Sequence, residues 1–249
     1  MKWVVCFLIS VLTLVIPGKA AEQKSPVLKS GECNFVARRS NMLNDYFIQL
    51  AEEIRFQPRW VNLAGGLEFD LTTTSYTRVF LQERVSINEN NAVILRLNHL
   101  EYADWQIGQN FINLYFQQRL NRVNWAAGIS YNSIILTGWT NPFKFQDEFA
   151  QYRALYAVSY GAALPKKFDL RLGLENFTQF ENYGYDQLGP YAEAGYQLTD
   201  RTRLKAKADF RFIGFGIGLI DLERKTYFVG IEWNNAPQKK MPATETASD

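Results

Sequence analysis

The chain of 249 residues carries 27 lysine and arginine residues against 25 aspartate and glutamate residues, which gives a formal net charge of +2. This near balance removes the main electrostatic support for binding to nucleic acid. Aromatic residues make up 15% of the chain, and beyond the N-terminal segment no apolar run is long enough to span a membrane as a helix.

Residues 1–20 resemble a bacterial secretory signal peptide. A positive charge at Lys2 precedes an uninterrupted apolar stretch, residues 3–16, and the small residues Gly18 and Ala20 stand before the predicted cleavage site. Cleavage there would leave 25 basic and 25 acidic residues, because the segment contains two lysines and no acid. One cysteine would remain, so the mature chain could form no intramolecular disulfide.

Residues 21–57 are predicted to form a periplasmic segment, with one amphipathic helix over about residues 41–55 that ends before Pro58. Such a helix could plug the fold that follows, lie on a membrane surface or cap the periplasmic opening. We expect it to cap the opening, because its basic residues are too sparse for a strong membrane-surface signal. The prediction depends on apolar residues spaced three or four positions apart: Leu43, Phe47, Leu50 and Ile54.

From residue 59 the chain alternates between apolar and polar residues, which is the side-chain period of a β-strand. Each alternating segment presents one mainly apolar face and one polar face. We therefore predict ten strands. They cover residues 60–71, 76–87, 92–102, 109–120, 123–131, 151–162, 168–176, 191–198, 202–212 and 224–233.

The strand predicted at 202–212 indicates which face of the sheet is inside. Five successive positions on one of its faces are charged, and such a face needs a wet or ion-paired environment. The interior of a membrane barrel provides that environment. A soluble barrel of the lipocalin type would need the inverse arrangement, an apolar interior and a polar exterior. The charged residues are Arg203, Lys205, Lys207, Asp209 and Arg211.

The connections between the strands alternate in length. Tight turns at 88–91, 121–122, 165–167 and 199–201 alternate with connections that are mostly longer. An even number of antiparallel strands with short turns at one end and long loops at the other resembles the outer-membrane β-barrel class of Gram-negative bacteria.

This resemblance implies an all-β, antiparallel, up-and-down transmembrane barrel of about 10 strands (8 to 12). The barrel would occupy residues 58–233 in the cell outer membrane, and residues 234–249 would form a disordered periplasmic tail. Expected partners are membrane lipid, the barrel-assembly machinery, and a small solute or polysaccharide, but no nucleic acid.

Outward-facing aromatic side chains are predicted to form two girdles, one near each membrane surface. Mostly small or aliphatic residues lie between them, as expected for the lipid-facing band. The periplasmic girdle contains Trp125, Tyr160, Tyr196 and Trp233, and the outer girdle contains Tyr131, Tyr152, Phe210 and Tyr227.

The inward faces combine basic and acidic residues, which leaves two interpretations of the lumen. One is a narrow or gated channel or export pore with a weak preference for anions along Lys205, Lys207 and Arg211. The other is an interior closed by mutual salt bridges. The predicted lumen-lining residues are Arg78, Arg96, Arg119, Arg153, Arg171, Glu175, Lys205, Lys207, Asp209 and Arg211.

Two further functions compete with the channel. A non-conducting surface-interaction or structural barrel is favoured by the aromatic residues of the outer loops. At exposed loop tips these residues could bind a surface partner or a sugar, or they could fold over the mouth of the barrel. A hydrolase at the rim would need His99, the sole histidine, but no serine or aspartate cluster accompanies it. We therefore predict no enzyme, no catalytic residues, no metal site and no cofactor. The aromatic loop residues are Trp105, Trp139, Phe143, Phe145, Phe177, Phe180, Tyr183 and Tyr185.

Overall fold

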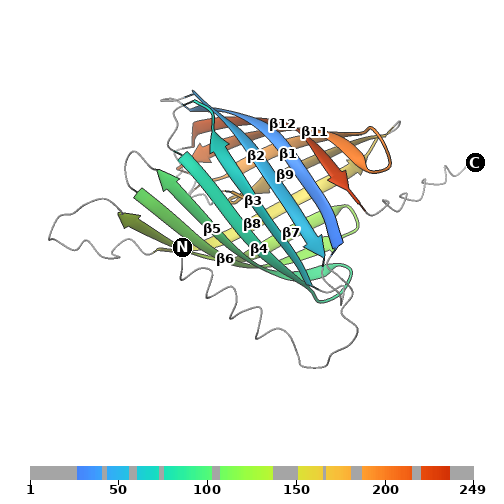
Figure 1. Cartoon of the computed structure of the whole chain (residues 1–249), viewed down its shortest axis with the longest axis horizontal. Coiled ribbons are helices and arrows are strands. Elements are labelled where there is room, and N and C mark those ends of the chain that lie inside the picture. Colours follow the sequence, from blue (N-terminus) through green and yellow to red (C-terminus); the bar gives the residue numbers. More distant parts are fainter. Residues whose placement is uncertain are drawn as a thin grey trace, which may run out of the picture.

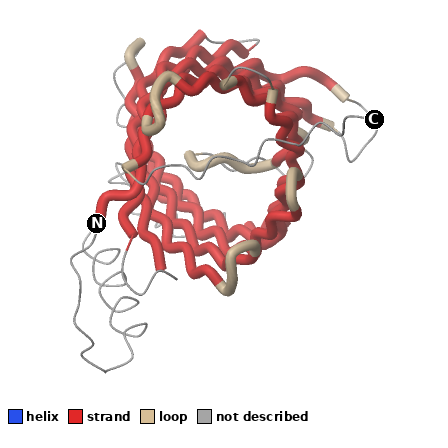
Figure 2. Tube along the Cα trace, turned by 90° about the vertical axis from the view of Figure 1, so that its right-hand side faces the viewer, coloured by secondary structure: helices blue, strands red, loops and turns tan. Residues whose placement is uncertain are grey.

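The computed structural model is a closed barrel of antiparallel strands (Figure 1), and its ring of strands is seen end-on in Figure 2. Each strand pairs with its neighbours in sequence, and β12 pairs with β1 to close the barrel. The strands are β1 (Val27–Ser40), β2 (Asn44–Arg55), β3 (Val61–Asp70), β4 (Tyr76–Ser86), β5 (Asn91–Tyr102), β6 (Ile107–Leu120), β7 (Val123–Leu136), β8 (Gln151–Ala163), β9 (Phe168–Glu175), β10 (Gly189–Gln197), β11 (Thr202–Ile213) and β12 (Asp221–Asn234). The structure describes residues 27–40, 44–55, 61–72, 76–102, 107–136, 151–164, 167–180, 187–214 and 220–235.

The two ends of the barrel differ in their connections. At one end, which we call the short-turn end, the connections after β4, β6, β8 and β10 are tight. The two-residue turn between β6 and β7 places Asn121 at φ 52°, a left-handed conformation that asparagine adopts more readily than most residues. The opposite end, the long-loop end, carries the longest connections, those after β7 and β9.

Side chains alternate between the lumen and the outside of the barrel. On β5, Ile94, Arg96 and Asn98 are buried on the inner face. The outer faces carry large apolar side chains that are exposed, such as Ile129 (57% exposed) and Val229 (63%). An apolar exterior around a polar interior is the arrangement of a barrel whose solvent is lipid.

The helix predicted over residues 41–55 is wrong, because residues of this segment form strand β2. Phe47 points into the lumen and is 2% exposed, whereas Leu50 and Ile54 point outward at 41% and 37%. An apolar residue on the inner face therefore disrupted the period of two and produced a spacing that resembles a helix. Phe47 faces inward because it packs with the buried Val36 of β1. Within the described ranges, no helix is long and apolar enough to cross a membrane.

The barrel therefore begins at Val27 and not at residue 58 as predicted. β1 was not predicted because the buried Val36 faces inward and the exposed Arg39 faces outward, so its sequence shows no clear alternation. The two added strands give twelve, within the predicted range of 8 to 12. The signal peptide predicted at 1–20 and nearly all of the predicted tail lie outside the described residues.

Candidate functional site

The connection between β9 and β10 enters the lumen. Its first part, residues 176–180, runs across the ring of strands as the tan segment in Figure 2. We call these five residues the inner loop. Contacts with the walls on both sides hold the inner loop in place, so the loop obstructs part of the lumen at its level.

Asn176 marks the point where the chain leaves the sheet. Its side chain is fully buried, its Oδ1 accepts a hydrogen bond from the backbone N–H of Tyr156 (2.8 Å), and its Nδ2 donates to the carbonyl of Ala154 (2.8 Å). The amide thereby satisfies backbone groups of β8 that a continued β9 would have paired. The main chain can turn inward without leaving these groups unpaired.

Phe177 anchors the inner loop to one wall. Its ring is 6% exposed and packs in an apolar cluster with Ile94, Tyr115, Ala126 and Leu155, side chains from β5 to β8. The ring centroids of Tyr115 and Phe177 lie 5.0 Å apart. Burying a phenylalanine contributes about 1.5–3 kcal/mol.

Phe180 anchors the loop to a different part of the wall. It is 3% exposed and packs against Ala51 of β2 and Phe80 of β4, with its ring edge-on to Phe80 at a centroid distance of 4.9 Å. The hypothesis that Phe177 and Phe180 belong to exposed aromatic loop tips is therefore wrong. The other six aromatic loop residues lie outside the described ranges.

Two side chains of β5 bind the backbone between these anchors. Arg96 Nη1 donates to the carbonyl of Thr178 (2.6 Å), and Asn98 Nδ2 donates to the carbonyl of Gln179 (3.0 Å). Arg96 is itself fixed, because its Nε and Nη2 donate to Gln82 Oε1 at 2.9 and 2.6 Å. The loop is thus held by both apolar packing and hydrogen bonds.

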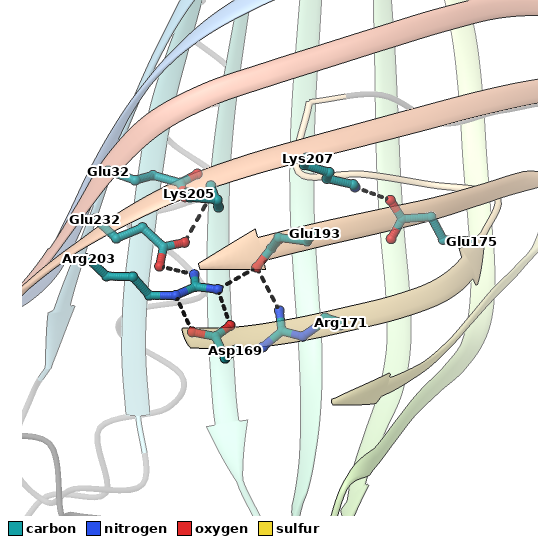
Figure 3. A network of polar contacts seen from close by, with 9 residues as sticks. All are labelled: Glu32, Asp169, Arg171, Glu175, Glu193, Arg203, Lys205, Lys207 and Glu232. Carbon is teal, nitrogen blue, oxygen red and sulfur yellow. Dashed lines mark hydrogen bonds and ion pairs between the residues drawn. The ribbon is translucent and has the colours of Figure 1, made fainter. Parts of the chain in front are cut away.

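Strands β9 to β12, together with β1, form a wall rich in ion pairs (Figure 3). Arg203 is central to it, with Nη2 2.5 Å from Asp169 Oδ1 and 3.1 Å from Glu193 Oε1, and Nη1 2.6 Å from Glu232 Oε2. The Arg203 guanidinium lies against Gly195, where any side chain would collide with it.

The same wall pairs Lys205 and Arg171 with acids. Lys205 Nζ lies 2.7 Å from Glu32 on β1 and 3.0 Å from Glu232 on β12, so it joins three strands. Arg171 Nη1 lies 3.6 Å from Glu193 Oε1 and is half-exposed. These pairs place nearly equal numbers of opposite charges on this wall.

Lys207 belongs to a second group nearer the inner loop. Its Nζ lies 2.7 Å from Glu175 and 3.7 Å from Asp209, and 4.2 Å from the ring centroid of Tyr191. Neighbouring Arg211 is 5% exposed. The anion preference expected along Lys205, Lys207 and Arg211 stays a prediction, and both lysines are paired with carboxylates.

A third charged group lies on β1 to β4. Glu68 is fully buried, and its Oε1 lies 3.1 Å from Arg78 and 3.8 Å from Arg38, while its Oε2 accepts a hydrogen bond from Gln49 (2.5 Å). A buried carboxylate needs this number of partners to offset its loss of hydration. Arg38 was absent from the predicted inward residues because it lies on β1, a strand that was not predicted.

The structure places the predicted lumen-lining residues on inward-facing strand positions. Lys205 and Lys207 pair with different acids, and Arg119 and Arg153 lie on β6 and β8, across the lumen from both lysines. These residues are Arg78, Arg96, Arg119, Arg153, Arg171, Glu175, Lys205, Lys207, Asp209 and Arg211.

A cavity of about 240 Å³ lies beside the inner loop, toward the short-turn end. Gln179 and Phe80 line it near the loop, and Glu32, Glu53 and Arg203 line it farther out. The lumen therefore holds open space next to the obstruction.

The eight predicted girdle residues lie on outward-facing positions, and all but Tyr227, in the middle of β12, lie toward a strand end. Trp125 and Tyr160 lie near the short-turn end, and the rings of Tyr131 and Tyr152 meet at a centroid distance of 5.4 Å near the long-loop end. The remaining three follow the same division. Tyr196 and Trp233 lie toward the short-turn end, and Phe210 toward the long-loop end.

His99 faces outward and is half-exposed, with Nδ1 2.8 Å from Asn110 Oδ1 and Nε2 4.0 Å from Glu101. Neither neighbour is a nucleophile that the imidazole could activate. In the described part of the chain, no group of three or more histidine, cysteine, aspartate or glutamate side chains could hold a metal ion.

The comparison with known proteins concerns the fold. No protein-family model matches the sequence, and no curated protein matches it. Among solved structures, the barrel is similar to the KdgM porin, with a TM-score of 0.51 at 8% identity over 82% of this chain and 99% of that one. The fold is that of outer-membrane porins. The NanC porin gives the same result, with a TM-score of 0.50 at 10% identity over 84% and 100% of the two chains.

The porin-like fold confirms the predicted all-β, antiparallel barrel class. The inner loop was not predicted. One signal could have indicated it: Phe177 and Phe180 stand three positions apart directly after a strand, and large apolar side chains at an exposed tip are unfavourable.

Proposed function

We propose that this protein is a narrow channel of the bacterial outer membrane, constricted by the inner loop, through which small polar solutes pass. The observation that supports this most directly is a closed, porin-like barrel whose polar lumen is narrowed at one level by residues 176–180. Export signal, fold and apolar exterior are consistent with this location.

A loop fixed inside a polar lumen reduces the pore diameter, and pore diameter is one of the properties that set which solutes a channel admits. Arg96 and Asn98 bind backbone carbonyls of the loop, and these hydrogen bonds add to the packing of Phe177 and Phe180. The cavity beside the loop leaves room for water and solute.

The second candidate is a non-conducting barrel. The ion pairs of Arg203 and Lys205 and the buried Phe177 and Phe180 favour it, because all of them fill the lumen. The aromatic-tip argument for a surface-interaction protein is weaker, since two of the aromatic residues are inside. We retain the expectation that the protein is not an enzyme.

Swelling of liposomes in uncharged sugars of increasing mass distinguishes the two candidates. The native protein should admit only the smallest sugars, and a variant lacking residues 177–180 should admit larger ones. If neither protein causes swelling although both are folded barrels, the channel is rejected and the non-conducting barrel is supported.

A further inference from the structure

Acidic residues are unevenly distributed around the lumen. The five consecutive strands β4 to β8 contain two acidic residues, Glu83 on β4 and Glu101 on β5. Both occupy outward-facing positions, because they alternate with the luminal Arg84 and Leu100. The described luminal face of β4 to β8, which we call the arginine wall, therefore carries no carboxylate.

The same wall carries arginines whose partners are neutral. Arg84 Nη1 donates to Gln117 Oε1 (2.7 Å), and Arg153 Nη2 donates to Gln151 Oε1 (2.8 Å). Arg96 binds Gln82, a tyrosine hydroxyl and the inner-loop backbone. Among the described residues, none of these three guanidinium groups has a carboxylate within ion-pairing distance. Arg78 of β4 is the exception on this wall, because it pairs with Glu68 of β3 at 3.1 Å.

These arginines are distributed along the whole lumen. Arg119 is the second-last residue of β6, and Arg84 is two residues from the end of β4, so both lie toward the short-turn end. Arg96 lies at the level of the inner loop, and Arg153 is the third residue of β8, at the long-loop end. Positive charge is present before, at and beyond the constriction.

The facing wall behaves differently. Three of its cations, Arg203, Lys205 and Lys207, are each within 2.7 Å of a carboxylate, and a fourth, Arg171, lies 3.6 Å from Glu193. Their fields largely cancel over short distances, whereas an uncompensated guanidinium beside a low-dielectric wall attracts anions. The electrostatic potential of the lumen is therefore expected to be most positive along the arginine wall.

We propose that the arginine wall is an anion-binding face, along which anions pass the inner loop while cations are disfavoured. This deepens the proposed function, on which the transport part of the inference rests. It also moves the expected anion path from Lys205, Lys207 and Arg211 to the opposite side of the lumen. The ligand class is defined by charge alone, so chloride and charged thiol reagents serve as probes.

The first test is the reversal potential in a planar bilayer under a potassium chloride gradient. The native protein should favour chloride, and Arg84→Gln combined with Arg153→Gln should lower the anion-to-cation permeability ratio by roughly twofold or more. Lys225→Gln removes one positive charge from the outer face of β12 and should leave the ratio unchanged. A ratio near one, or an equal effect of both changes, would overturn the proposal.

The second test does not need conductance. In a Cys33→Ser background, Gln117→Cys places a thiol beside Arg84, and Ser30→Cys places one beside Glu53 on the other wall. An anionic methanethiosulfonate should react faster than a cationic one at position 117, and Arg84→Gln should abolish this preference. At position 30 neither reagent should be strongly preferred, because Glu53 is paired with Lys29 at 2.7 Å.

The outcomes separate the two proposals. Equal rates of the two reagents at position 117, the same anionic preference at position 30, or a preference at 117 that survives Arg84→Gln would each refute the anion-binding face even if the barrel conducts. A clear anionic preference at 117 in a protein that conducts nothing would refute the channel and leave the anion-binding face standing.

Discussion

At the residue scale, the main ion-pair group depends on the missing side chain at Gly195. The guanidinium of Arg203 occupies the space that a Cβ atom at this position would need. From there it contacts Asp169, Glu193 and Glu232. A glycine on β10 thus lets an arginine on β11 reach across to β9.

Gly195→Ala should displace Arg203 from Asp169 and Glu193. Overpacking and broken contacts together should lower the free energy of unfolding by about 1–3 kcal/mol. Gly161→Ala, on the luminal face of β8, is the matched control, since its Cβ would meet only a carbonyl oxygen at 3.8 Å. Urea unfolding in detergent measures the stability of both refolded variants. Equal stability of the two would contradict the packing of Arg203 against Gly195.

The alternation of the sequence predicts the face on which a charged side chain lies, but it does not predict the partner. Lys205 and Glu32 are 173 positions apart and meet only because β12 closes onto β1. β1 itself showed no readable alternation. The pairings in the lumen therefore depended on a strand that the sequence pattern does not reveal.

At the scale of elements, β1, β2 and the inner loop were the parts that the sequence pattern did not predict. In β2 an apolar cluster inside the lumen hides the strand period, as Phe47 shows. In the inner loop, Asn176 and Phe177 act through partners on β5 to β8. Local pattern carries no information about such long-range contacts.

The strand assignment of β2 can be tested with the native thiol. Leu50 lies directly opposite Cys33 in the β1–β2 register, and both are exposed on the outer face. Directly opposite residues are within reach of a disulfide. Oxidation of Leu50→Cys should therefore consume both thiols, as measured by loss of maleimide labelling.

Ile48→Cys is the control for this experiment, because it lies opposite Phe35 and not opposite Cys33. After oxidation the two thiols of this variant should still react with maleimide. Equal cross-linking at positions 48 and 50 would mean that the register, and with it the strand, is wrong.

At the scale of the whole molecule, closure by β12 onto β1 is the property that makes a barrel. The same thiol tests it, since Cys33 lies opposite Ile231 across this seam. Ile231→Cys should form a disulfide with Cys33 under mild oxidation, and Val229→Cys, opposite Phe35, should not. If β12 did not pair with β1, the thiols of both variants would remain fully reactive toward maleimide.

Fold class and topology were predictable because ten of the strands alternate clearly. The number of strands that the sequence did not reveal, two, is even, so the predicted strands keep their directions. Adding two strands before residue 58 changes the diameter of the barrel but keeps the direction of every later strand. The obstruction of the lumen was not predictable, and it decides whether the barrel is a wide pore, a narrow one or none.

The most direct test of a channel constricted by the inner loop is single-channel conductance with the loop released. Phe177→Ala combined with Phe180→Ala removes both anchors, and the conductance should rise by roughly twofold or more over that of the native protein. Phe47→Ala, a luminal phenylalanine that packs against Val36 and Leu100, should cause no comparable rise. Equal conductance of the native and double-variant proteins, or none in either, would contradict the account.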